Sequence, residues 1–242
     1  SSKMDVPMRH PYAGKLVFTA FSGSHQDAIN KGMQAMHEKN QEWWEVPYLP
    51  IDPSDIGREY EPIVRINSQS GKGGVAFVMD SEFGYKLPKR MHKEFADVIQ
   101  KIAEEQGEVA PATIMEVFEK EYLRKKTPYE FIRAKAEDVA ENETEVEVVF
   151  MAGEELKSAK AVGNGPLAAL KKLMADETGM DFTLVDYSQH ALSKGSEAKA
   201  AAYICLHDNR TGKETYGVGV SANITRAGFR AFFSAVDRLI EN

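Results

Sequence analysis

The hydrophobic period of this chain changes once, near residues 124–128, and that change limits the possible folds more than any other feature. Before it, apolar residues recur at helical spacing, as they do over residues 88–102 and 111–123. After it, apolar and polar residues alternate, which is typical of strands with one buried face. A helical part followed by a strand-rich part predicts an α+β chain.

The strand-rich part contains the same order of elements twice. We expect the first unit to contain a strand from Phe131, a polar turn over 138–142, a strand from Val146 to Phe150, a short strand over 156–162 and a helix over 167–174. The second unit is expected to contain strands near 181–188, 199–207 and 214–221 and a helix over about 225–240. Two consecutive βββα units predict one pseudo-symmetric α+β domain.

The first half is expected to be mainly helical. Apolar spacing predicts helices over residues 25–39 and 111–123, and another that begins near Pro88, a residue suited to a first turn. Residues 71–83 fit either a helix or a strand, and residues 60–66 alternate weakly. Between the helices, three prolines in the segment 46–53 stiffen an arm that presents Tyr48 and Asp52.

Composition excludes several classes of function. The 242 residues are 43% hydrophobic and 28% charged, which is ordinary for a globular protein large enough to bury a core. The net charge of −7, with both signs interspersed, argues against a nucleic-acid partner. No apolar stretch or leader predicts a membrane partner, so we expect a cytoplasmic protein. The single cysteine, Cys205, is expected to be a buried strand residue.

His25 is a candidate proton-transfer residue. Ser24 and Asp27 have capping-box spacing, which predicts a helix start with His25 in its first turn. The positive end of a helix favours the neutral imidazole, and a neutral imidazole can accept a proton. The alternative is a histidine that only forms local hydrogen bonds. A hydrolase triad is excluded, because neighbours on one turn cannot point at each other.

Metal and phosphate sites are not predicted. The six histidines are scattered, without His-x-His or i,i+4 spacing, so we expect no metal site in this chain. The run Gly71-Lys72-Gly73-Gly74 departs from a phosphate-binding loop, which requires an earlier glycine and a Ser or Thr after the lysine. We expect a turn or helix start there, although Lys72 remains available for an anionic ligand.

Several long, ordered strings of this sequence are uncommon: residues 9–14, 16–29, 46–53, 65–74, 163–166, 186–187 and 217–220. Together these strings resemble a known family, the long form of 2-isopropylmalate synthase. They extend over nearly the whole chain. The resemblance implies that the chain is the C-terminal part of a larger enzyme and follows a (β/α)₈ catalytic barrel.

The resemblance also implies a division into parts. These are residues 1–20 as a remnant after the barrel, 21–66 as a first linker subdomain, 67–126 as a second, helical one, and 127–242 as a regulatory domain. It favours a helix over residues 71–83. The divalent cation of the reaction (Mg, Mn or Zn) is expected in the barrel, so this part is expected to bind no cofactor and to be inactive alone.

The family condenses acetyl-CoA with 2-oxoisovalerate in leucine biosynthesis. The resemblance implies that His25 transfers a proton, and that Tyr48 hydrogen-bonds near the reacting carbonyl or relays the leucine signal. Both residues are expected to reach the active site of the partner subunit in a homodimer.

Residues 163–167 join a strand to a helix, where free amides can receive a carboxylate. Two ordinary helix caps beside a normal core explain the same pattern. The resemblance implies instead a site for the feedback inhibitor leucine between two subunits. The implied residues are Asn164, Gly165, Leu167, Leu184, Tyr187, Ala191, Ala198, Ala200 and Ile224. Leu184 stands where relatives have valine, which alters the expected pocket.

Two other hypotheses remain open at this point. A stand-alone amino-acid-binding dimerisation module would explain the absence of metal ligands, but it has no evident use for His25 and Tyr48. Citramalate synthase has a similar regulatory domain that binds isoleucine, but its strings around these two residues are less similar.

Overall fold

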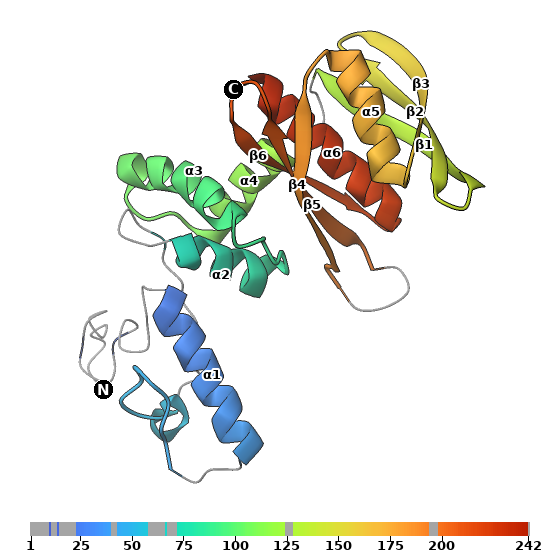
Figure 1. The fold of residues 1–242 in the computed structure, drawn as a ribbon. Coiled ribbons are helices and arrows are strands. Elements are labelled where there is room, and N and C mark those ends of the chain that lie inside the picture. The colour runs from blue at the N-terminus through green and yellow to red at the C-terminus, as the bar shows by residue number, and fades with distance from the viewer. Residues whose placement is uncertain are drawn as a thin grey trace. The chain divides into compact units, whose positions relative to one another are not determined.

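The structure is a computed structural model that describes residues 10, 14, 23–39, 43–57, 66, 72–123, 128–193 and 198–241. The chain divides into two compact units, coloured along the chain in Figure 1. The first unit comprises residues 1–82 and 92–114, and the second comprises residues 83–91 and 115–242. The expected remnant over residues 1–20 lies outside the described residues, apart from His10 and Gly14.

The first half is helical, as the sequence predicts. Its elements are α1 (Gly23–Lys39), the 3₁₀ helix η1 (Pro53–Ile56), α2 (Lys72–Phe83), α3 (Met91–Gln106) and α4 (Pro111–Tyr122). The segment expected over residues 71–83 is therefore a helix and not a strand in its described part, Lys72–Phe83, and Lys72 is the first residue of α2. Of the weak strand expected over 60–66, only Ile66 is described, and it pairs with Val109 in an isolated bridge. The two linker subdomains stay a prediction.

The expected helix start at Pro88 is wrong. The carbonyl of Pro88 accepts a hydrogen bond from the amide of Met91 at 2.9 Å, which closes a turn, and α3 begins only at Met91. Residues 84–90 therefore form a non-helical connection between Phe83, the last residue of α2, and Met91, the first residue of α3. The whole segment 83–91 belongs to the second unit.

The second unit contains the two predicted βββα repeats. Its elements are β1 (Tyr129–Ala140), β2 (Glu143–Ala152), β3 (Glu155–Gly163), α5 (Pro166–Thr178), β4 (Phe182–Ala191), β5 (Ala200–Asp208), β6 (Glu214–Ser221) and α6 (Ile224–Glu241). Each repeat forms an antiparallel sheet, in the orders β1-β2-β3 and β4-β5-β6. The first turn is shorter than the expected 138–142, because Asp138 pairs with Thr144 and accepts its hydroxyl at 2.9 Å.

The repeats match at the level of single hydrogen bonds. A shift of 58 residues (220 − 162, and again 230 − 172) carries Val162 onto Val220 and Lys172 onto Arg230. In each repeat the cationic side chain of the helix donates to the carbonyl near the end of the preceding strand, at 2.9 Å for Lys172 and 2.6 Å for Arg230. The internal pseudo-symmetry is therefore a property of the structure and not only of the element order.

Both sheets and both helices share one hydrophobic core. In Figure 1, α5 lies on β2 and β3, while α6 lies on β5 and β6 and also reaches β1. The contact of α6 with β6 is unusually close: a Cβ at Gly217 would lie 2.1 Å from the Ala235 nitrogen, and one at Gly219 would lie 2.2 Å from the Ala227 oxygen. Only glycine fits at these two positions.

The close contact predicts that Gly219→Ala destabilises the second unit by about 1–3 kcal/mol through overpacking. A matched control exists on α6, since a Cβ at Gly228 would meet its nearest neighbour at an ordinary 3.5 Å. Gly228→Ala should leave stability unchanged or raise it slightly, because alanine favours helix. Urea unfolding monitored by circular dichroism measures both variants, and equal stabilities would contradict the close-packing argument.

Candidate functional site

His25 and Tyr48, the two residues singled out from the sequence in the first unit, lie together. Their rings stack with centroids 4.0 Å apart and planes 23° from parallel. His25 lies in the first turn of α1, and Tyr48 lies on the proline-rich arm after it. Residues 23 positions apart in the chain thus form one aromatic pair, as a shared functional site requires.

Packing of the arm against α1 holds this pair. Ile29 of α1 forms a small buried cluster with Val46 and Leu49 of the arm. A Cβ at Gly32 would lie only 2.7 Å from Pro47 Cδ, so the glycine permits the close approach. His25, Ile29 and Gly32 are spaced at i, i+4 and i+7, which places them on one face of the helix.

A hydrogen bond from Trp44 closes the arm around Tyr48. The Trp44 indole Nε1–H donates to the Leu49 carbonyl at 2.8 Å. Within this closed loop Tyr48 has φ +62°, in the left-handed region that non-glycine residues rarely adopt. Such a conformation costs of order 1–3 kcal/mol and is often found where function requires a particular side-chain direction.

The geometry leaves the reactive groups of the pair accessible. Stacking covers ring faces, whereas the imidazole nitrogens and the phenol hydroxyl lie at the ring edges. Tyr48 is 61% exposed and His25 is half-buried. The pair can therefore present a proton acceptor and a hydrogen-bond donor side by side to a surface or ligand that approaches it.

Other predictions about the first unit have different outcomes. The capping box rests on the side chains of Ser24 and Asp27, which lie outside the described ones. Among the residues that the structure describes, no three or more histidine, cysteine, aspartate or glutamate side chains come together where they could hold a metal ion. No helix in the described parts of the chain is long and apolar enough to cross a membrane.

The expected leucine residues of the second sheet share one face. Ala200 belongs to the hydrophobic core between the sheets and helices α5 and α6, and Leu184 packs against this core. Ala191 pairs with Ala200, and Tyr187 pairs with the buried core residue Ile204. Because side chains alternate along a strand, these residues all face the helices.

Leu167 and Tyr187 converge on a glycine that sequence reasoning missed. A Cβ at Gly228 of α6 would lie 3.5 Å from the Tyr187 hydroxyl and 3.7 Å from Leu167 Cδ2. The Tyr187 hydroxyl donates to Gln189 Oε1 at 2.8 Å, and burial raises the pKa of this phenol. A glycine inside an amphipathic helix was the available signal, since it costs about 1 kcal/mol relative to alanine.

The remaining expected leucine residues are less gathered. Gly165 is the residue before α5, Asn164 is exposed, and Ile224, the first residue of α6, is 54% exposed. Ala198 is half-buried. A cavity of about 560 Å³ lies elsewhere in the second unit, between the end of α4, the start of β1, β6 and α6, and its described lining includes none of the nine residues.

Comparison with known proteins assigns the second unit to a family. Residues 108–240 match the family model described as the LeuA allosteric (dimerisation) domain. The chain belongs to this family. Residues 15–80, which include the His25–Tyr48 pair, match the model described as alpha-isopropylmalate synthase, post-catalytic domain-like.

Several curated relatives of this LeuA-domain chain carry the same name. Proteins called 2-isopropylmalate synthase are 46% identical to it in Clostridium acetobutylicum, 44% in Mycobacterium ulcerans and 42% in Rhodospirillum rubrum. Each alignment covers 98% of this chain but only 43% or 44% of the relative. The resemblance read from the sequence is confirmed, and the chain spans less than half the length of these relatives.

The closed arm predicts that Trp44→Phe loosens the Tyr48 loop, because phenylalanine cannot donate to the Leu49 carbonyl. We expect a loss of about 1 kcal/mol in stability and weaker contacts between the His25 and Tyr48 rings in NMR spectra. Trp43→Phe is the matched control, since Trp43 is the neighbouring residue and is 79% exposed. Unchanged ring contacts in Trp44→Phe would contradict the role of this hydrogen bond.

Proposed function

We propose that this chain is the C-terminal linker and allosteric region of a 2-isopropylmalate synthase. The complete enzyme would condense acetyl-CoA with 2-oxoisovalerate and would be inhibited by leucine. The observation that carries the proposal is the stacked His25–Tyr48 pair, which lies in the part matching a post-catalytic domain of that enzyme. The chain alone would be inactive, because the substrate-binding region and the divalent cation would belong to the part of the enzyme that precedes it.

The pair suits one step of that reaction. Condensation requires removal of a methyl proton from the acetyl thioester before the new carbon attacks the 2-oxo carbonyl, and hydrolysis of the thioester follows. A neutral imidazole that presents its edge can accept or relay this proton. The Tyr48 hydroxyl can donate a hydrogen bond to an oxygen that gains negative charge. In a homodimer, these side chains would be lent to the active site of the partner subunit.

The regulatory half of the proposal concerns the inner face of the second sheet. Leu167, Tyr187 and Gly228 enclose a position that an aliphatic side chain would fill. The family description, an allosteric and dimerisation domain, supports a small-molecule effector and a paired arrangement. Leucine is the effector we propose, since the relatives' reaction leads to leucine, and Asn164 and Gly165 would receive its carboxylate.

A stand-alone amino-acid-binding module is the second candidate. It would explain the LeuA domain equally well. It does not explain why the arm holds Tyr48 in a costly backbone conformation against His25. The reported relatives are named 2-isopropylmalate synthase, which favours that enzyme over citramalate synthase.

The catalytic assignment predicts that His25→Asn lowers turnover of the complete enzyme by at least about tenfold, because asparagine cannot accept the proton. His37→Asn is the control, since His37 is an exposed histidine of the same helix. Steady-state kinetics with both substrates measure the effect. A change of less than tenfold in His25→Asn would remove the assigned role.

The regulatory assignment predicts that the complete enzyme binds leucine and that Gly228→Ala weakens this binding at least about tenfold, since the added methyl fits the unliganded fold but occupies space beside Leu167 and Tyr187 that the leucine side chain would fill. Gly73→Ala, on α2 with nothing within 4 Å of the added carbon, should bind leucine normally. Titration calorimetry provides the measurement. Absence of heat with millimolar leucine would refute the assignment.

A further inference from the structure

Strand β4 has two faces with different neighbours. Tyr187 and Ala191 face the helices, at the proposed leucine site. His190, whose side chain points to the opposite face, stacks on Tyr203 of β5 with ring centroids 5.7 Å apart. The proposed leucine site and the His190 side chain thus lie on opposite faces of the same strand.

The outer face of strand β5, in the middle of the second sheet, is buried. Ala201, Tyr203 and Cys205 of β5 are each at most 1% exposed, although they alternate with the residues that face the helices. The outer face of the first sheet differs: there Lys160 forms ion pairs with Glu145 and Glu147 at 3.2 and 3.5 Å, and these side chains remain partly in solvent. The pseudo-symmetry is therefore broken by a cover on one sheet only.

Residues 83–91, which we call the docking segment, contribute to this cover. The Lys86 amide donates to His190 Nε2 at 3.0 Å, and Gly84, at φ +74°, approaches the Leu192 carbonyl so closely that a Cβ would lie 3.2 Å from its oxygen. Tyr85 and Leu87 are buried, and the Tyr85 ring packs on Phe118 of α4 with centroids 5.0 Å apart. The segment is thus fixed by its backbone as well as by its side chains.

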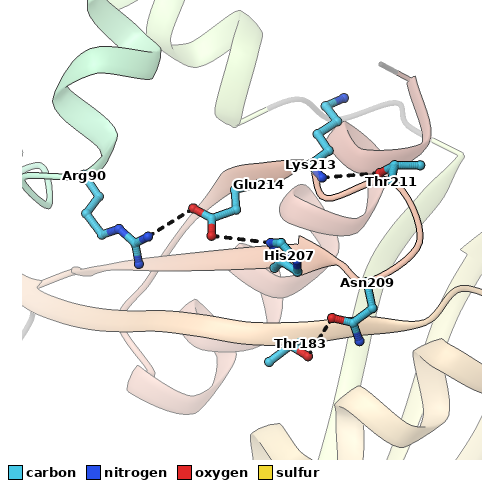
Figure 2. Close-up of polar contacts among 7 residues, drawn as sticks. All are labelled: Arg90, Thr183, His207, Asn209, Thr211, Lys213 and Glu214. Carbon is cyan, nitrogen blue, oxygen red and sulfur yellow. Dashed lines mark hydrogen bonds and ion pairs between the residues drawn. The ribbon is translucent and has the colours of Figure 1, made fainter.

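A second anchor lies at the other end of the docking segment. Figure 2 shows Glu214 between Arg90 and His207, with Arg90 Nη2 to Oε2 at 3.2 Å and His207 Nδ1 to Oε1 at 3.4 Å. The same view shows the Thr183 hydroxyl donating to Asn209 Oδ1 at 3.0 Å, which braces the β5–β6 turn from which Glu214 follows. The Arg90 and Glu214 side chains are largely in solvent, so this ion pair contributes little to stability by itself.

The partners of His190 define its tautomer. Nε2 accepts the Lys86 amide, so the proton of the neutral ring resides on Nδ1, which lies 3.2 Å from the Ala191 carbonyl. The Tyr203 hydroxyl, 3.0 Å from Nε2, completes the arrangement. The imidazole therefore links the main chain of Ala191, at the proposed leucine site, to the main chain of the docking segment.

The docking segment is also the covalent connection between α2 and α3. Residues 72–82 and 92–106 of these helices belong to the first unit, which also contains His25 and Tyr48. Any change in how tightly the segment is held on the sheet therefore acts on the chain that runs directly into the first unit at both ends.

From these contacts we infer that His190 is the positioning residue that couples the leucine site to the first unit, an inference that rests on the proposed function. Leucine packed against Tyr187 and Ala191 orders the end of β4, which strengthens the hold of His190 on the Lys86 amide. The docking segment is then fixed on the sheet, and the α2–α3 connection loses the freedom that turnover requires. Coupling of this kind is commonly worth a factor of about 5 to 150 in affinity.

The test uses the complete enzyme with His190→Leu, which removes the acceptor, and His190→Gln, whose side-chain oxygen can accept from the Lys86 amide. His190→Leu should keep its basal turnover and its calorimetric leucine affinity within about threefold, while the leucine concentration for half-inhibition rises at least about tenfold. His190→Gln should restore inhibition to within about threefold of the unaltered enzyme. Lys86→Pro, which removes the donated amide proton and keeps His190, should weaken inhibition in the same direction and serves if His190→Leu does not fold.

Three results would overturn the inference. Normal leucine inhibition of His190→Leu would remove the coupling role and leave the proposed function intact. Loss of leucine binding in step with loss of inhibition would make His190 part of the leucine site and not a coupling residue. Absence of leucine binding by the unaltered enzyme would refute the proposed function, and this inference with it.

Discussion

Burial of strand β5 on both faces is the constraint on which the second unit depends. Its residues from Ala200 to Leu206 are all buried. The helices cover one face, and burial of large apolar side chains there contributes about 1.5–3 kcal/mol each. The other face carries Tyr203 and Cys205, and leaving it in water would forfeit the same kind of energy. A LeuA domain of this sequence therefore needs the docking segment as part of its own fold, although that segment precedes the strand-rich part of the chain.

The same constraint explains how two repeats with matching inner architecture come to differ on their outer faces. Lys172 and Arg230 make equivalent hydrogen bonds to the ends of β3 and β6, so the repeats share their inner architecture. Their outer faces differ. The outer face of the first sheet carries lysine and glutamate side chains that form ion pairs in solvent. The outer face of the second sheet carries the buried residues Ala201, Tyr203 and Cys205 of β5. Among the described residues, the second sheet contacts the docking segment on its outer face through His190, and the proposed leucine residues of its strands lie on its inner face.

Much of the fold could be predicted from the sequence, because period and alternation are local signals. These local signals were sufficient to predict the two βββα units and the helix over 111–123. They left residues 71–83 open between helix and strand, and the family resemblance decided for a helix. The start of α3 could not be predicted from Pro88, because the turn there belongs to the docking segment. His190 holds this segment through the Lys86 amide, and these two residues are 104 positions apart. The His25–Tyr48 pair was proposed from resemblance, but its stacking and the left-handed backbone of Tyr48 depend on Trp44 and Gly32, whose contacts no spacing rule indicates. Gly228 was missed although a glycine inside an amphipathic helix is a visible signal, because its neighbours Leu167 and Tyr187 come from distant parts of the chain.

The hydrogen bond from the Lys86 amide to His190 joins the strand of the proposed leucine site to the docking segment. Amide hydrogen exchange at Lys86 in the complete enzyme tests this most directly, because that amide is itself the donor. With saturating leucine the account predicts exchange slower by at least about threefold at Lys86, alongside protection of β4. Protection of β4 with unchanged exchange at Lys86 would contradict it.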